Sequence, residues 1–250
     1  MTRELEGQVA IVTGSAKNIG RAINLALADA GAKVVINANT SAQEANDLAD
    51  EINAAGGEAM AAIADIRDAG AVQEMVDSAA KKFGGINIVI NNASMRQLAP
   101  LEEMTLEKWR GIMAVTVEGA VLTTVAALPH LRTCGNGTVI NISGIASQAG
   151  VTDRLHAATA NAALEGMARS LAHELAPYGV TANSVSPGLI DTVRGASAGT
   201  LPPNMQGADN LLGRKGKPEE IAAMVRALCG PAGRYVTGQT VCVNGGMYLT

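Results

Sequence analysis

The first strand-to-helix junction constrains the fold of this chain more than any other stretch. Residues 9–13 form an apolar run, the chain turns at Gly14, and apolar residues then recur at helical spacing from Ile19 onward. Gly14 lets the backbone leave the strand sharply, and Gly20 lets the helix lie close to the sheet. The free amides at the helix start lie at the positive end of its dipole and would face a diphosphate. This stretch therefore predicts the opening of a dinucleotide-binding α/β unit.

Strand-like runs alternate with helix-like segments along the whole chain. The predicted strands are Val9–Thr13, Lys33–Asn37, Ala59–Ala64, Ile86–Asn91, Thr138–Ser143, Thr181–Ser186 and Thr240–Asn244. The predicted helices are Ile19–Ala30, Ala42–Ala55, Ala69–Phe83, Leu106–Leu131, Ala157–Ala176 and Pro218–Leu228. This alternation predicts one α/β domain over residues 1–250, with a doubly wound, Rossmann-type parallel sheet of seven strands. The stretch Gly188–Lys217 has no pattern and is interpreted either as a substrate lid or as a mobile loop.

The composition limits the classes of function. The chain has 250 residues, enough to bury a substantial core, and a formal net charge of −4 that argues against a nucleic-acid or anionic-membrane surface. No apolar run reaches the length of a membrane span, and the N-terminus lacks the apolar core of a secretion signal. Cys134, Cys229 and Cys242 have no metal-ligand spacing. We therefore expect reduced thiols, no metal site and a cytoplasmic protein.

Further segments extend the pattern beyond the first junction. They are Thr13–Gly20, Asp65, Asn91–Ser94, Val139–Ser143, Ser170–Gly179, Asn183–Thr192 and Val236–Thr240. In their order and spacing, which cover almost the whole chain, they make it resemble the short-chain dehydrogenase/reductase family. The resemblance implies a Rossmann-type fold, usually tetrameric, that binds NAD(H) or NADP(H).

The resemblance also implies which residues hold the cofactor. They are Gly14, Lys17, Asn18, Ile19, Gly20, Asn37, Asp65, Ile66, Asn91, Ala93, Pro187, Gly188 and Thr192. Asn18 replaces the family's middle glycine, and asparagine tolerates glycine-like backbone angles. NADP(H) is favoured if a cofactor binds, because no carboxylate follows Asn37 to repel a 2′-phosphate and Lys17 stands where NADP-dependent relatives carry a basic residue. Lys17 is equally typical of an exposed polar loop, Asp65 of a turn, and Asn91 of a tie between strands.

The positions that the resemblance aligns with the family's catalytic residues carry other side chains here. Ala157 falls at the Tyr position, Asn161 at the Lys position, Gly144 at the Ser position and Thr116 at the Asn position. In the family, the Tyr exchanges a proton with the reacting oxygen, and the Lys lowers the pKa of that Tyr and binds the nicotinamide ribose. The Ser holds the oxygen, and the Asn supports a proton relay. The resemblance therefore implies no catalytic residue at these positions, and cofactor binding that is weakened or lost.

Polar neighbours could replace these groups only with a change of geometry. His156 precedes the alanine, but one helical step turns a side chain by roughly 100°. Ser143 precedes the glycine on a predicted strand, where successive side chains face opposite ways. Asp153 and Arg154 lie in the intervening loop and could reach the site, but we interpret both of them, together with His156, as ordinary solvated loop residues.

Two main functions follow as hypotheses. The first is a non-catalytic subunit in a tetramer, homo-oligomeric or formed with a catalytically intact relative, for example one acting on hydroxyacyl-coenzyme A substrates. The segments Leu106–Leu131 and Ala157–Ala176 carry the small and apolar residues typical of tetramer interfaces in the family, although these also suit a core facing the sheet. The second is an NADP(H)-dependent oxidoreductase with unconventional catalytic groups, acting on a substrate that needs no proton from the protein. A nucleotide-sensing module that binds tightly without turnover is a third alternative.

Overall fold

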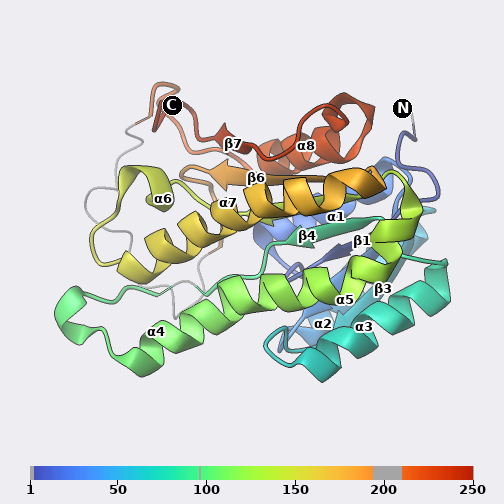
Figure 1. Cartoon of the computed structure of the whole chain (residues 1–250), viewed down its shortest axis with the longest axis horizontal. Helices are drawn as coiled ribbons and strands as arrows, with labels where there is room; N and C mark the ends of the chain where they lie inside the picture. The colour runs from blue at the N-terminus through green and yellow to red at the C-terminus, as the bar shows by residue number, and fades with distance from the viewer. Residues whose placement is uncertain (1–2, 96, 194–209, 250) are drawn as a thin grey trace.

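A parallel sheet runs through the centre of the molecule (Figure 1). The computed structural model describes residues 3–95, 97–193 and 210–249. Its seven strands lie in the order β3-β2-β1-β4-β5-β6-β7, and each neighbouring pair is parallel. They are β1 (Val9–Val12), β2 (Lys33–Ala38), β3 (Glu58–Ile63), β4 (Ile88–Asn91), β5 (Thr138–Ile142), β6 (Thr181–Pro187) and β7 (Thr240–Val243). The predicted Rossmann-type sheet is confirmed.

Helices cover both faces of the sheet. One face packs against α1 (Asn18–Asp29), α2 (Ala42–Ala54) and α8 (Pro218–Cys229), and the other against α3 (Ala69–Phe83), α5 (Gly119–Cys134) and α7 (Leu155–Leu175). The helices α4 (Leu106–Met113) and α6 (Ala146–Ala149) lie beyond the carboxyl ends of the strands (Figure 1). Short turns of 3₁₀ helix complete the description: η1 (Leu101–Glu103), η3 (Ala176–Tyr178) and η6 (Pro231–Gly233).

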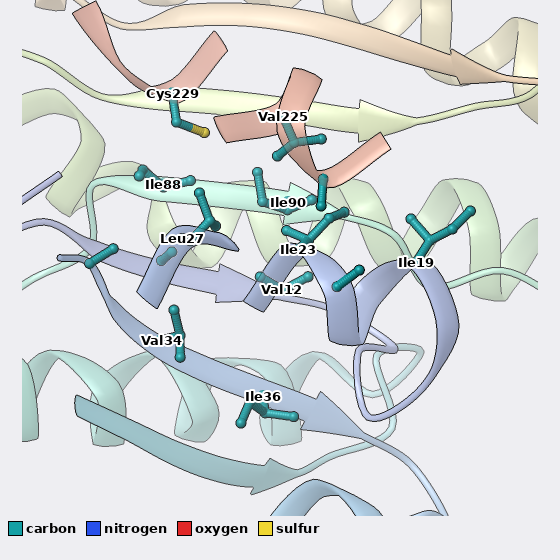
Figure 2. Packing of buried hydrophobic residues seen from close by; sticks show 14 of the residues in the cluster. Val12, Ile19, Ile23, Leu27, Val34, Ile36, Ile88, Ile90, Val225 and Cys229 are labelled. Carbon is teal, nitrogen blue, oxygen red and sulfur yellow. The ribbon is translucent and has the colours of Figure 1, made fainter. Parts of the chain in front are cut away.

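The central strands β1, β2 and β4 are apolar on both sides because both sides are buried. Val12, Val34 and Ile90 point toward α1 and α8, where Ile23 and Val225 meet them (Figure 2). The intervening strand residues Ile11, Val35 and Val89 belong to a second cluster with α3, α5 and α7. This alternation leaves the carboxyl ends of the strands as the edge where polar side chains gather, which is where ligands bind in open α/β sheets.

Two helix boundaries differ from the predictions in ways that affect the site. The expected helix Leu106–Leu131 consists of α4, a π-helical segment η2 (Ala114–Glu118) and α5, which continues to Cys134. The helix α7 begins at Leu155, earlier than expected, so that His156 lies inside its first turn.

The segment Leu106–Cys134 corrects one sequence-based expectation. It is helical over 29 residues, and its most apolar 18-residue window has a mean hydropathy of 1.8, so by length and composition alone it could cross a membrane. Charged residues near its start interrupt the apolar run and hid this from the sequence. Of its most apolar window, 44% is buried inside the chain, as in a core helix with one apolar face left open.

Candidate functional site

A cavity of about 180 Å³ opens at the carboxyl ends of β4, β5 and β6; we call it the central cavity. Its walls include the four positions aligned with catalytic residues, Thr116, Gly144, Ala157 and Asn161. Four of the expected cofactor residues also line it, namely Ile19, Pro187, Gly188 and Thr192. Further walls come from Asn92, Ser94, Met95, Gln97, Ile112, Ile142, Ser143, Ile145, Ala146, Val151, Arg154, Ala160, Leu189, Ile190 and Lys215. The fold therefore brings the separate sequence motifs into one place.

Gly144 and Asn161 fit against each other at the edge of this cavity. The Asn161 side-chain amide Nδ2 donates to the Gly144 carbonyl oxygen over 3.3 Å. A Cβ atom added at Gly144 would lie 3.0 Å from that Nδ2, which is tighter than ordinary contact. The asparagine thus occupies the space that a side chain at position 144 would need. We refer to Gly144, Ala157 and Asn161 together as the β5–α7 corner.

Thr116 reaches the cavity from the π-helical segment η2. A π segment adds a residue to one helical turn and often marks a functional site. The Thr116 side chain is buried, with 5% of its surface exposed. The local widening therefore aims a small hydroxyl side chain at the wall of the cavity.

A buried carboxylate lies directly behind the β5–α7 corner. The Ser147 hydroxyl donates to Glu165 Oε1 over 2.6 Å, and the Ser143 hydroxyl donates to the same oxygen over 3.3 Å. Glu165 is only 9% exposed, whereas Ser143 lines the central cavity. Ser143 and Gly144 both reach the cavity because β5 ends at Ile142, so the alternation expected for a strand no longer applies. No sequence motif indicates Glu165 as a site residue, since it comes from the middle of α7.

His156 is absent from the lining of the cavity, as predicted, but the interpretation of it as a solvated loop residue is wrong, because it lies buried in the first turn of α7. Its ring is fully buried, and Nε2 lies 3.1 Å from the carbonyl oxygen of Gln97. Burial lowers the pKa of His156, the hydrogen bond to Gln97 opposes that shift, and the positive charge of Arg154 adds to it. Its Nδ1 atom has no hydrogen-bond partner among the described residues. The imidazole is therefore held neutral inside the protein and does not face a substrate.

Arg154 corrects the interpretation of this loop as simply solvated. It lines the central cavity, and its Nε and Nη2 atoms are buried. Asp153 precedes it with a left-handed backbone (φ 60°) and accepts a hydrogen bond from the Ala99 amide over 2.9 Å. This turn directs Arg154 inward at the start of α7.

The cofactor turn, residues 13–20, has the predicted backbone geometry. Gly14 has φ 57° and Asn18 has φ 53°, both in the left-handed region. A Cβ atom at Gly20 would lie 2.5 Å from Ser15 Cα, so only glycine allows α1 to lie this close. Lys17, the N-cap residue of α1, makes no side-chain capping hydrogen bond to the first amides of the helix. Asn18 also exchanges two hydrogen bonds with the Val193 backbone, at 3.1 and 2.9 Å.

Two of the expected cofactor residues use their side chains to hold the sheet together. The Asn37 side chain accepts from the Gly14 amide over 3.1 Å and donates to the Ala64 carbonyl over 3.0 Å. The Asn91 side chain donates to Asn141 Oδ1 over 2.9 Å across β4 and β5. Gly14 and Ala93 are in close contact, which holds the two strand ends together. Any cofactor contact from Asn37 or Asn91 stays a prediction.

Two charged side chains at the expected adenosine end have partners in the protein. Lys17 Nζ lies 2.6 Å from Glu44 Oε1, and both side chains are about half exposed. Asp65 pairs with Arg67, and this hydrogen-bonded guanidinium lowers the pKa of the Asp65 carboxyl. Ile66 beside it is buried against Gly119. A nucleotide with a 2′-phosphate would compete with Glu44 for Lys17.

Lys215 is a wall residue that the sequence did not suggest. Residues 188–193 and 210–217, the described ends of the patternless stretch, lie together through a bridge between Ile190 and Gly216. Hydrogen bonds from the Asp191 amide to the Gly216 carbonyl (2.8 Å) and from the Gly216 amide to the Leu189 carbonyl (3.0 Å) fix this bridge. The remaining part of Gly188–Lys217 lies outside the described residues. Within the described ranges, no group of three His, Cys, Asp or Glu side chains is placed to hold a metal.

Comparison with known proteins agrees with this geometry. Residues 14–248 match a family model described as enoyl-(acyl carrier protein) reductase. An uncharacterized oxidoreductase of Methylorubrum extorquens is 39% identical (98% of this chain, 99% of that protein), and a 3-oxoacyl-[acyl-carrier-protein] reductase of Synechocystis is 37% identical (98% of each). A short-chain dehydrogenase from Burkholderia cenocepacia, solved in complex with NADP, superimposes with a TM-score of 0.89 at 34% identity (98% of this chain, 99% of that one). The chain therefore belongs to the short-chain dehydrogenase/reductase family of oxidoreductases.

Proposed function

We propose that this chain is a non-catalytic subunit that assembles with a catalytically intact member of its family in the cytoplasm. One observation carries the proposal. Ala157 and Gly144 line the cavity at the positions where the family resemblance places the proton-donating Tyr and the oxygen-holding Ser. Neither residue has a polar side chain, so neither can move a proton or hold an oxygen.

The rate contributions of a general acid and of an oxygen-holding donor are large enough that a site without them should not reduce ketones at an ordinary rate. A positioned general acid or base contributes ~10²–10⁴-fold to a rate, and a donor to developing negative charge contributes about 10²–10³-fold. These contributions overlap rather than multiply. We nevertheless expect hydride transfer to a ketone to be at least ~10⁴-fold slower than in an intact relative, because the resulting alkoxide needs a proton.

The charged residues near the cavity are poor replacements. The buried ring of His156 contacts the Gln97 carbonyl rather than the cavity. The guanidinium of Arg154 does not give up its proton at ordinary pH. Lys215 Nζ forms an ion pair with Asp191 Oδ1 over 3.4 Å.

An exposed apolar face on the long helical segment supports assembly. Val121 and Val125 of α5 are 42% and 60% exposed, and Leu106 at the start of α4 is 60% exposed. Side chains of this kind on one helix face suit a protein partner. We propose an intact relative as that partner, and one acting on hydroxyacyl-coenzyme A thioesters is the first class to examine.

The cofactor turn fits NADP(H), and we propose that binding is retained but weakened. The uncapped start of α1, Gly14 and Gly20 together suit a diphosphate. The similar Burkholderia cenocepacia protein was solved with NADP, and the strand β2 ends without a carboxylate. Asn161 stands where the resemblance places the ribose-binding Lys, which removes one contact. When bound, NADPH would supply a hydride, and the chain's own residues would only hold and orient it.

The test is purification from the native host followed by native mass measurement. We expect a hetero-oligomer whose second subunit carries an intact Ser, Tyr and Lys, while the isolated chain shows no NADPH turnover. A Val125→Glu variant should lose the partner, whereas Ile63→Glu, which changes an exposed apolar side chain (50%) at the end of β3, should keep it. A homo-oligomer that reduces carbonyl substrates at an ordinary rate would overturn the proposal.

The Ser143–Glu165–Ser147 cluster favours a second candidate, a reductase or dehydrogenase with unconventional groups. Its carboxylate is linked to the cavity through the Ser143 hydroxyl, which gives a route by which a proton could leave a substrate alcohol. This candidate predicts that the isolated chain turns over and that Glu165→Gln removes the activity. Turnover that survives Glu165→Gln would rule out this route.

A further inference from the structure

An ion pair joins the cofactor turn to the helix that follows β2. Lys17 Nζ lies 2.6 Å from Glu44 Oε1, and the two side chains are 55% and 44% exposed. Lys17 is the N-cap residue of α1, whereas Glu44 lies in the first turn of α2. The Gly14 amide donates to the Asn37 side chain over 3.1 Å, which holds the same turn against the end of β2. The ion pair therefore lies where the starts of α1 and α2 approach the end of β2.

This place in the fold is where an adenosine ribose is expected. In a doubly wound sheet, a dinucleotide lays its diphosphate at the start of the first helix and its adenosine ribose at the end of the second strand. A carboxylate there accepts from a free ribose 2′-hydroxyl, whereas a cation binds a 2′-phosphate. The strand β2 ends at Ala38, and Asn39 and Thr40 follow it without a carboxylate. Lys17 and Glu44 are therefore charged side chains next to the expected 2′ oxygen.

The two side chains have opposite effects on a phosphate at this place. The Lys17 ammonium attracts it, whereas the Glu44 carboxylate repels it and already neutralises that ammonium. The hydrogen bond from Lys17 lowers the pKa of the Glu44 carboxyl, so this group is ionised at neutral pH. A 2′-phosphate must either displace Glu44 from Lys17 Nζ or lie beside its negative charge. A free 2′-hydroxyl carries no charge and avoids both costs.

The helix α2 keeps Glu44 close to Lys17 in the protein without nucleotide. Ala45 and Leu48 of this helix are buried, which fixes α2 on the sheet. A carboxylate in the first turn is also favoured by the positive end of the helix dipole. The competing carboxylate is thus built into the fold.

We propose that Glu44 is a specificity-determining residue, which occupies Lys17 and lowers the preference of this chain for a 2′-phosphorylated nucleotide over one with a free 2′-hydroxyl. The inference rests on the nucleotide binding proposed above and deepens it, because it names the group that sets the choice between NADP(H) and NAD(H). It requires binding and no turnover.

The test compares two nucleotides that differ only in the 2′-phosphate. The dissociation constants of NADP⁺ and NAD⁺ for the purified full-length chain are measured by calorimetry. We expect Glu44→Gln to tighten NADP⁺ at least about fivefold and to change NAD⁺ by less than about twofold, because an exposed ion pair and a like-charge repulsion are removed together. Asp50→Asn, which removes an exposed carboxylate from the same helix, should leave both dissociation constants unchanged.

A double variant shows whether Glu44 acts through Lys17. In a Lys17→Met background, the gain in NADP⁺ affinity from Glu44→Gln should shrink to less than about twofold, because the phosphate and the carboxylate no longer compete for a cation. A gain that persists in that background would overturn the proposal.

The remaining outcomes separate this inference from the proposed function. If both nucleotides bind and Glu44→Gln leaves the ratio of their dissociation constants unchanged, or tightens both equally, this inference alone fails. If neither nucleotide binds, the inference and the proposed cofactor binding fail together. The non-catalytic subunit is tested separately by its assembly and by turnover, which none of these results affects.

Discussion

The cofactor turn and the β5–α7 corner lie at the same edge of the sheet, yet they differ in what carries their chemistry. In the cofactor turn the important groups are backbone atoms, held by Gly14, Asn18 and Gly20. In the β5–α7 corner the family resemblance places reactive side chains, and this chain has glycine, alanine and asparagine. Backbone-built features depend on the fold itself, whereas side-chain chemistry can change without disturbing it.

Within the β5–α7 corner, Gly144 and Asn161 are packed against each other. Asn161 donates to the Gly144 carbonyl, and the space for a side chain at position 144 is taken by that amide. The replacement at one position therefore affects the other. A side chain added at position 144 alone would crowd the Asn161 amide, so positions 144 and 161 should be changed together.

Joint reversion should produce the largest effect. We expect Gly144→Ser, Ala157→Tyr and Asn161→Lys, combined with Thr116→Asn, to raise NADPH-dependent reduction of 3-oxoacyl thioesters by at least ~10³-fold, because the variant gains a general acid and an oxygen donor. The activity is measured as the initial rate of NADPH oxidation, followed by absorbance at 340 nm over a time on the order of minutes. The same variant with Ala157→Phe is the matched control, since it restores the ring without the hydroxyl. A reverted chain that folds and binds NADPH but gains nothing over the Phe control would contradict the proposed cause of inactivity.

The second prediction concerns the backbone of the cofactor turn. A Cβ atom at Gly20 would lie 2.5 Å from Ser15 Cα, so Gly20→Ala forces α1 away from the sheet. We expect the free energy of unfolding to fall by roughly 1–3 kcal/mol, together with a loss of nucleotide binding. Urea unfolding measures the first effect, and calorimetry with NADP⁺ measures the second.

Gly166→Ala is the control for that variant. Gly166 lies within α7, and nothing lies within 4 Å of an added Cβ there. Alanine is a better helix former than glycine, so this change should stabilise the protein by about 0.5–1 kcal/mol. Equal destabilisation by both variants would show that close packing at Gly20 is not the cause.

The sequence predicted best what depends on neighbours along the chain. Strand-like runs predicted all the described strands, most clearly β1, β2 and β4, which are apolar because both of their faces are buried. The glycine turn predicted the positive φ at Gly14 and Asn18. The register of the motifs also placed Thr116, Gly144, Ala157 and Asn161 around one cavity. These features follow from local pattern plus the order of strands in a doubly wound sheet.

What the sequence did not predict depends on contacts between distant segments. Glu165 meets Ser147 and Ser143 only because α7 crosses behind the end of β5. Lys215 reaches the cavity through the bridge at Ile190, and Arg154 turns inward because of the backbone at Asp153. None of these contacts leaves a periodic signal, so only the fold reveals them.

A buried histidine makes the β5–α7 side of the site sensitive to pH. Burial lowers the pKa of His156 below its ordinary value of 6.5, so the folded protein binds its proton less readily than the unfolded chain. Stability should therefore be unaffected by this group above that value and should fall as the pH drops below it. We expect the free energy of unfolding of His156→Gln, measured by urea unfolding from about pH 7 to 5, to fall less with pH than that of the original protein. His173→Gln, at an exposed position of α7, should keep the pH profile of the original protein.

The smallest expected effect tests whether the open start of α1 is reserved for a ligand. Lys17 is the N-cap residue, with an extended backbone (φ −138°, ψ 165°) and no capping hydrogen bond. The serine in Lys17→Ser should cap the helix. Without nucleotide, the free energy of unfolding of Lys17→Ser should therefore be about 1 kcal/mol higher than that of Lys17→Ala. Because the serine oxygen takes an amide that the diphosphate would use, the same variant should bind NADP⁺ more weakly than Lys17→Ala does. Both variants lose the ion pair with Glu44, so their difference isolates the cap. If the two variants match in stability and in NADP⁺ affinity, the amides of this turn do not hold the diphosphate, and the contrast between a backbone-built and a side-chain-built half of the site fails.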